Sequence, residues 1–234
     1  MKNLIFIIIL FSVINCGKGE SQEEGKIEEN SLPEVYNKVY GATSIDLQGD
    51  HVVIKVDGTP DHKSPYFKEI DPSYAPYDGS NPNFNLNPNR ITSFDFTYKI
   101  PLNPSEASNK SSTRLGSIGV ALNGVAIYNQ YAGPNNQPLT REINSFDQYN
   151  GHPQPQGVYH YHMEPLYLTE NQGNDALLGF LLDGFPVYGP FENMVKVTNE
   201  DLDDYHGHNH ATDDFPSGIY HYHITENDPY INGN

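Results

Sequence analysis

The chain is poor in cysteine, tryptophan and basic residues, and each shortage argues against something. Its 234 residues include one cysteine and no tryptophan, and 13 lysines and arginines stand against 30 aspartates and glutamates. A single cysteine cannot form a disulfide within the chain. The net charge of −17 argues against nucleic acid or an anionic membrane surface as a partner, because long-range repulsion opposes both. The balance is typical of a protein exposed outside the cytoplasm.

The apolar run near the N-terminus, from Leu4 to Ile14, is too short to span a membrane as a permanent helix. It predicts a signal peptide over residues 1–15. Cys16 follows directly, in VINC, which resembles the lipobox of bacterial lipoproteins. We therefore expect a lipid on Cys16 to anchor the protein to the cell envelope, as an outer-membrane lipoprotein with no other membrane contact. The alternative is a secreted protein with one spare thiol.

Residues 16–34 are predicted to be an acidic linker. The stretch GKGESQEEGKIEENSLP has two apolar residues in seventeen, too few to bury the surface that folding requires. Glu20, Glu23 and Glu24 resemble the export signals that place some lipoproteins on the outer leaflet, which predicts exposure at the cell surface. The alternative is a solvated tether without a signal.

Residues 35–234 are predicted to form a single all-β domain with little helix. Eighteen prolines and twenty glycines favour many turns between short strands. HVVIKV (51–56) and SFDFTYKI (93–100) indicate strands, and the proline- and asparagine-rich residues 70–90 indicate a long loop. Residues 191–204 are the best helix candidate, with Thr198 as its cap.

An internal repeat organises the second half of the sequence. GVALNGVAIY (119–128) matches GFLLDGFPVY (179–188), and GVYHYHM (157–163) matches GIYHYHI (218–224). The predicted repeat units are residues 119–163 and 179–224. Each is a strand-loop-strand unit, so we expect antiparallel sheets in which the two copies pack with approximate two-fold symmetry. Residues 35–118 would extend or cover that sheet.

The duplicated tetrad predicts a transition-metal site. Successive side chains of a strand point to opposite faces, so the histidines of each tetrad share one face and the tyrosines the other. Imidazoles at alternate positions can converge on one ion. Either four of them meet near the symmetry axis, or each copy has its own site. The expected ligands are His152, His160, His162, His206, His208, His210, His221 and His223.

Copper and zinc fit such a histidine patch better than iron does. Around the ligands we expect an outer layer of side chains that orients the imidazoles by accepting their free N–H groups. The structural alternative has no ion: the tyrosines pack in the core and the histidines donate to aspartates or carbonyls. The candidates for the outer layer are Asp147, Asp183, Asp203, Tyr159, Tyr161, Tyr220 and Tyr222.

Several motifs in a fixed order resemble the YHYH domain family of secreted, mostly bacterial proteins. These are the two tetrads, LDGFPVYGP (182–190), the glycine-histidine pairs at 151 and 207, and DGTPDHKSPYF (57–67). The resemblance covers residues 35–234 and implies a β-rich domain without an established activity. Members often have a cysteine before each glycine-histidine pair, where this chain has Tyr149 and Tyr205.

Three functions are compatible with these patterns. The first is an envelope lipoprotein that carries, stores or senses a metal. The second is an extracellular enzyme, either a metal-dependent hydrolase or oxidase or a polysaccharide lyase that uses tyrosine and histidine as acid and base. The third is a module whose tyrosine-rich loops bind an extracellular glycan or protein. No phosphate-binding glycine loop, nucleophile elbow or HExxH helix is present in the sequence.

Overall fold

β-Strands make up most of the regular structure in residues 31–232, the part of the chain that the computed structural model describes. The predicted signal peptide, Cys16 and all but the last residues of the predicted linker lie outside it. The folded unit begins at Leu32, and Leu32 and Val35 pack against its hydrophobic core. In these residues no helix has the length and apolarity that crossing a membrane requires.

Residues 31–232 form two main sheets, besides two two-stranded hairpins. The smaller sheet has three antiparallel strands, β1 (Ala42–Gln48), β2 (His51–Val56) and β3 (Phe96–Pro101). The larger has eight strands in the order β14-β15-β11-β10-β4-β5-β9-β8. Its strands are β4 (Ser117–Ala121), β5 (Ala126–Tyr128), β8 (Gly151–Pro153), β9 (Tyr159–Tyr161), β10 (Leu177–Leu181), β11 (Pro186–Tyr188), β14 (Gly207–His210) and β15 (Ile219–His223).

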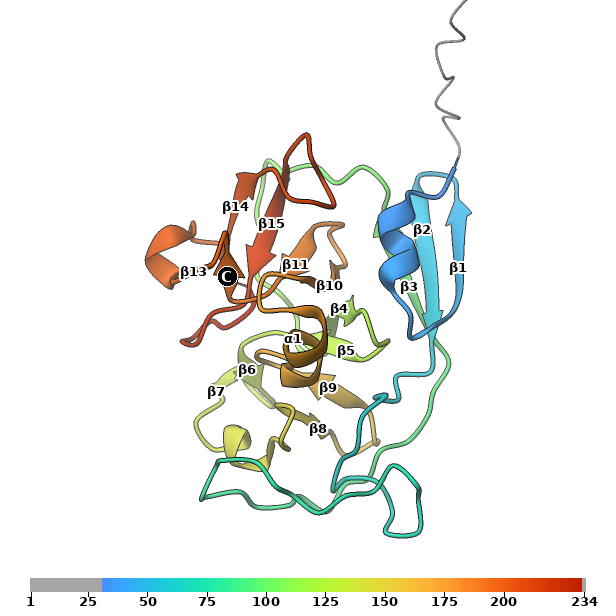
Figure 1. The fold of residues 1–234 in the computed structure, drawn as a ribbon, viewed down its shortest axis with the longest axis vertical. Coiled ribbons are helices and arrows are strands. Elements are labelled where there is room, and N and C mark those ends of the chain that lie inside the picture. Colours follow the sequence, from blue (N-terminus) through green and yellow to red (C-terminus); the bar gives the residue numbers. More distant parts are fainter. Residues whose placement is uncertain (1–30, 233–234) are drawn as a thin grey trace, which may run out of the picture. The chain divides into compact units, whose positions relative to one another are not determined.

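The large sheet has the same strand order on both sides of its central pair. At the centre β4 and β10 are antiparallel, with Val120 opposite Phe180. We call one side of the sheet the first half, which consists of β4, β5, β9 and β8 in order from the centre outward. The other side is the second half, which consists of β10, β11, β15 and β14. In Figure 1 the two tetrad strands, β9 and β15, accordingly lie toward opposite ends of the sheet.

The large sheet is mixed rather than purely antiparallel, which differs from the prediction. β5 pairs with β9 in parallel, and β11 pairs with β15 in parallel. A parallel neighbour requires the chain to return to the end where the first strand began. On the way the chain first forms a small hairpin, β6 (Tyr131–Ala132) with β7 (Gln137–Pro138) or β12 (Phe191–Glu192) with β13 (Val195–Lys196). It then runs through β8 or β14, which is antiparallel to the tetrad strand that follows.

Helix is limited to short segments, as predicted. These are α1 (Leu166–Gln172) and three 3-10 turns, η1 (Glu34–Lys38), η2 (Glu142–Ser145) and η3 (Asn199–Asp201). The helix predicted within 191–204 is reduced to η3, where the Thr198 side chain and Asp201 form the capping box. The sequence reading did not single out α1, whose Leu168 is fully buried and fixes the connection between the halves.

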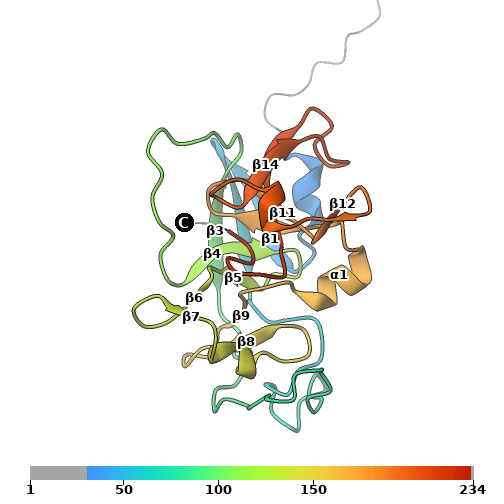
Figure 2. The same cartoon turned by 90° about the vertical axis from the view of Figure 1, so that its left-hand side faces the viewer.

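The segment between β2 and β3 is the predicted long loop, and it runs beside β8 in both views (Figures 1 and 2). Its side chains are tied to the first half of the large sheet. Tyr66 is fully buried, and its hydroxyl donates to the carbonyl of Ser145. Asn87 and Asn89 both donate to the carbonyl of Pro153. Part of residues 35–118 therefore covers the large sheet instead of extending it.

Candidate metal centres

The tetrad strands separate histidines from tyrosines as the period of a strand requires. In β9, Tyr159 and Tyr161 have no exposed surface and belong to the main hydrophobic core. His160 and the following His162 point to the opposite side, where His152 of the neighbouring β8 pairs with His160. β15 repeats the arrangement next to β14. Each half of the sheet therefore brings its own histidines together.

The first centre consists of His152, His160 and His162. The Nε2 atom of His160 lies 3.1 Å from that of His152 and 3.0 Å from that of His162. All three side chains are buried, with 2% of each residue exposed. Three ligand atoms thus converge on one point from two adjacent strands, and this group can hold a metal ion.

The Nδ1 atoms of the first centre are all engaged in hydrogen bonds that define the tautomers. His160 Nδ1 donates to the carbonyl of Val158 at 3.0 Å, and His162 Nδ1 donates to the carbonyl of Asn129 at 2.6 Å. Ser145 Oγ donates its hydrogen to Glu142 O, so it accepts from His152 Nδ1 at 2.8 Å. Because Nδ1 carries the proton in each neutral ring, the three Nε2 atoms present lone pairs to one another.

Burial keeps these imidazoles neutral. It lowers the pKa of His152 to about 3 and that of His162 to about 4, and it lowers the pKa of His160 well below its usual value. For His152 and His160 the neighbouring histidines lower the pKa further. A neutral imidazole is the form that binds a metal ion.

Aromatic rings and one carboxylate complete the surroundings of the first centre. Tyr128 stacks on His160 with a centroid distance of 3.9 Å, and Phe146 lies parallel to His162 at 5.7 Å. Glu142 Oε1 is 3.5 Å from His152 Nε2, and burial raises the pKa of this carboxyl group. These rings hold the imidazoles in place, and Glu142 brings a carboxylate close to His152.

The second centre consists of Glu192, His208, His221 and His223, whose ligand atoms all lie within 4.8 Å of one another. Glu192 Oε1 is 3.8 Å from His208 Nε2 and 4.0 Å from His221 Nε2. The Nε2 atoms of the three histidines are buried and have no hydrogen-bond partner among residues 31–232. This centre therefore adds a carboxylate to the set of three imidazoles.

The second centre uses the same means of orientation as the first. His221 Nδ1 donates to the carbonyl of Ile219 at 2.9 Å, and His223 Nδ1 donates to that of Gly189 at 2.8 Å. Burial lowers the pKa of His223 to about 4 and lowers the pKa values of His208 and His221. Partial burial raises the pKa of Glu192, but the hydrogen bond from His210 and the other nearby histidines outweigh it and lower the pKa.

The two centres differ in access. The first is closed, whereas in the second the side chains of His208 and Glu192 are 17% and 22% exposed. Five strand-to-strand steps separate β9 from β15, which corresponds to about 24 Å. Four imidazoles therefore cannot meet on the symmetry axis, and the alternative with one site in each half describes the structure.

His206 and His210 lie apart from the converging Nε2 atoms. The sequence placed them with His208 on one face of an extended segment, but His206 has a left-handed backbone with φ of 72°. Its Nε2 bonds Thr225 Oγ1 at 2.9 Å. His210 is exposed, stacks on His208 and donates from Nδ1 to Glu192 Oε1 at 2.9 Å. His210 thus orients Glu192, and His206 is used elsewhere.

The aspartates expected around the imidazoles bind the tyrosines instead. Asp147 accepts the hydroxyl of Tyr159, at 2.8 Å to Oδ2. Asp203 accepts that of Tyr220 at 2.9 Å, and Asp183 accepts that of Tyr222 at 2.6 Å. They lie on the tyrosine side of the strands, and backbone carbonyls or the Ser145 hydroxyl accept the imidazole N–H groups instead. Tyr161 bonds Asn123 and His62.

Sequence reasoning missed Glu192, Glu142 and Ser145. Glu192 reaches the second centre from the β12-β13 hairpin, and Glu142 and Ser145 reach the first from η2. No local motif marks them, because long-range folding brings them to the histidines. The alignment of the repeats was the available signal, since η2 and the hairpin each lie in the segment of their repeat that leads to the two strands that supply the histidines.

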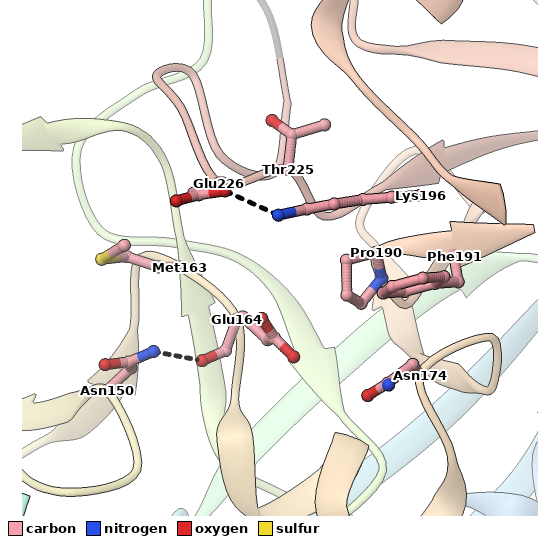
Figure 3. A pocket seen from close by; sticks show the side chains of 9 residues that line it. All are labelled: Asn150, Met163, Glu164, Asn174, Pro190, Phe191, Lys196, Thr225 and Glu226. Carbon is pink, nitrogen blue, oxygen red and sulfur yellow. Dashed lines mark hydrogen bonds and ion pairs between the residues drawn. The ribbon is translucent and has the colours of Figure 1, made fainter.

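The hollow shown in Figure 3 lies away from both sets of ligands. Its volume is about 400 Å³, and its lining contains no histidine. The ion pair of Lys196 with Glu226, at 2.6 Å, bounds one side. The hydrogen bond from Asn150 to the carbonyl of Glu164, at 2.9 Å, bounds another. The ion pair lies within the second half and the hydrogen bond within the first half, and neither supplies converging ligand atoms.

Comparison with known proteins identifies the family of this chain. A search of curated proteins and a search of solved structures each found nothing similar to this chain. The sequence model of the family described as YHYH protein matches residues 97–198 and 191–233, which include both tetrads and both centres. The chain therefore belongs to the YHYH protein family.

Proposed function

We propose that this protein binds a transition metal, copper or zinc, at two centres, and that it serves the cell envelope as a metal carrier, store or sensor. Cys16, through a lipid, would anchor it to the outer membrane. The observation that carries the proposal is that the Nε2 lone pairs of three histidines converge in each half. The described partners of the Nδ1 atoms of these histidines all accept a hydrogen bond, so Nδ1 carries the proton and Nε2 is left as a ligand atom.

The spacing within the first centre supports a metal ion over a hydrogen-bonded network. Two lone pairs that face each other at 3.0 Å repel unless a cation lies between them. Four-coordinate zinc with Zn–N bonds of about 2.0–2.1 Å places neighbouring nitrogens about 3.3 Å apart. The distances of 3.0 and 3.1 Å are close to this value. The ligand atoms of the first centre are therefore spaced as a bound zinc ion would require.

The surroundings favour a binding role over catalysis. Neither the 400 Å³ hollow nor the larger cavity of about 990 Å³ near Tyr220 has a histidine in its lining. A metal-dependent hydrolase or oxidase needs an open coordination position that faces a substrate cavity. The closed first centre suits retention of a metal, and the partly exposed second centre suits exchange.

Metal titration of the full chain tests the proposal. We expect two equivalents of Zn(II) or Cu(II) per chain, measured by calorimetry and by elemental analysis after dialysis. The double variant His160→Ala/His162→Ala should bind one equivalent, and the further changes His221→Ala and His223→Ala should remove the other. His51→Ala changes a histidine in β2 that belongs to neither centre and should leave two equivalents. Stoichiometric binding by the fourfold variant would contradict the proposal.

The anchor has a separate test. Intact-mass measurement of the mature protein should show a lipid on Cys16, and an unmodified thiol at that position would refute the anchored form while leaving the metal centres unaffected.

A further inference from the structure

The tyrosine side of the first half is covered by the chain itself. His62 Nδ1 donates to the carbonyl of Lys63, so its Nε2 accepts the hydroxyl of Tyr161 at 3.1 Å. Ser64 Oγ donates to Asp147 Oδ2 at 2.5 Å. Residues 62–67 thereby bury the aspartate, of which 3% is exposed. This cover, residues 62–67, supplies the imidazole ring of His62 and the hydroxyl group of Ser64.

In the second half the corresponding acceptor is Asp203, which no segment like residues 62–67 covers in the part of the chain that the structure describes. Asp203 Oδ1 accepts from the backbone of Tyr205 and Gly207 and from the Tyr220 hydroxyl, as Asp147 Oδ1 does from Tyr149, Gly151 and Tyr159. Within residues 31–232, however, no group donates to Asp203 Oδ2. The position that corresponds to the Ser64 hydroxyl is thus unfilled by protein.

A cavity of about 990 Å³ lies over this side of the second half. Asp183, Asp203, Tyr205 and Tyr220 contribute to one wall, and residues 104–115 form much of the other. Lys110 lies over the Tyr205 ring, 5.2 Å from its centroid. The cavity therefore combines aromatic rings with exposed carboxylates and two cations, Lys110 and Arg114.

The lining indicates the chemistry of a ligand. The exposed carboxylate of Asp203 can accept from a donor such as a hydroxyl group, and rings such as Tyr220 can pack against the C–H faces of a sugar. The cavity is as large as those that hold drug-sized ligands. The chain's net charge of −17 disfavours an anionic ligand.

We propose that this cavity binds a neutral oligosaccharide, with a sugar hydroxyl donating to Asp203 Oδ2 as Ser64 donates to Asp147 in the first half. The site lies on the tyrosine side of the strands, opposite the imidazoles, so it is independent of the metal centres.

Calorimetry on the full chain tests the site, with maltohexaose, cellohexaose, xylohexaose and chitohexaose as neutral probes and hexagalacturonate as the anionic probe. At least one neutral probe should bind with a Kd in the range of about 1 µM to 1 mM. Asp203→Asn should weaken that binding roughly tenfold or more, because it removes a charged acceptor. Asp175→Asn changes an exposed carboxylate outside the cavity and should have no effect.

Metal stoichiometry serves as the control for folding, because Asp203→Asn leaves every ligand of both centres in place. The proposal is overturned if no neutral hexasaccharide binds up to about 10 mM. It is equally overturned if a correctly folded Asp203→Asn variant binds as tightly as the original chain, or if hexagalacturonate binds more tightly than every neutral probe.

Discussion

At the scale of single residues, the hydrogen bond on Nδ1 decides what each histidine can do. His160 and His221 both donate Nδ1–H to the carbonyl two residues earlier, which leaves Nε2 as a ligand atom. His62 also donates from Nδ1 to a carbonyl, yet its Nε2 faces a hydroxyl donor, Tyr161, and forms an ordinary hydrogen bond. The same tautomer thus gives a candidate ligand where imidazoles converge and a structural contact where a tyrosine is adjacent.

Asp147 and Asp203 show how burial changes the contribution of the same hydrogen-bond arrangement to stability. Asp147 and Asp203 accept similar sets of donors, but Asp147 is buried and Asp203 is exposed. Burial raises the pKa of Asp147, and the donors around it, including Ser64 and Tyr159, oppose that rise. A buried donor that loses its acceptor cannot turn to water instead.

Asp147→Ala should therefore lower the free energy of unfolding by about 3 kcal/mol or more, because it leaves several buried donors without an acceptor. Asp203→Ala is the matched control and should cost about 1 kcal/mol or less, since water can reach its donors. Urea unfolding of both variants measures the difference. Equal losses in the two variants would show that the contrast in burial does not govern stability here.

At the scale of elements, the central strand pair joins the two halves through close backbone contact. A Cβ atom on Gly179 would lie 2.3 Å from Val120 O, and one on Gly119 would lie 2.5 Å from Phe180 O. Both obstacles are backbone atoms, which cannot move aside as the end of a side chain can. Glycine at these two positions is what allows β4 and β10 to adopt the observed register.

Gly179→Ala should consequently destabilise the protein by about 3 kcal/mol, the upper end of the usual cost of overpacking. Gly133→Ala is the control, because its Cβ would meet nothing closer than 3.9 Å and its φ is not positive. We expect that control to change stability by no more than about 0.5 kcal/mol. Thermal unfolding followed by circular dichroism distinguishes the two, and a tolerated Gly179→Ala would contradict the register.

At the scale of the whole molecule, the centres lie in separate halves of one sheet. Each draws ligands from a pair of adjacent strands, and the second also draws Glu192 from a hairpin. A metal ion that binds only the folded state stabilises it by mass action. Metal binding at either centre should therefore strengthen the whole fold.

Zinc at about 100 times its Kd should add about 2.7 kcal/mol for each centre. For a protein of this size that corresponds to a rise in Tm of about 5–10 °C for each centre. Scanning calorimetry with zinc and after chelation measures it. The fourfold histidine variant should show no rise, and a similar rise in that variant would mean that the stabilising ion binds elsewhere.

The strand period and the repeated sequence were enough to predict the β-rich fold and the separation of histidines from tyrosines. They also led to the family, which the match over residues 97–198 and 191–233 confirms. The roles of the aspartates were not predictable in this way. Asp147 and Asp203 are close in sequence to histidines, but distance along the chain does not tell which face of a strand a turn will approach.

The sequence by itself determined the periodicity of β9 and β15, because alternation is a local property of an extended backbone. Only the tertiary structure decided that β9 and β15 lie five strand steps apart, so that the histidines form two centres. It also decided that Glu192 joins the second centre and that carbonyl groups accept hydrogen bonds from the imidazoles. Residues 62–67 cover the tyrosine side of the first half only, which is a further result of the tertiary structure. These outcomes depend on long-range pairing, which no local pattern in the sequence encodes.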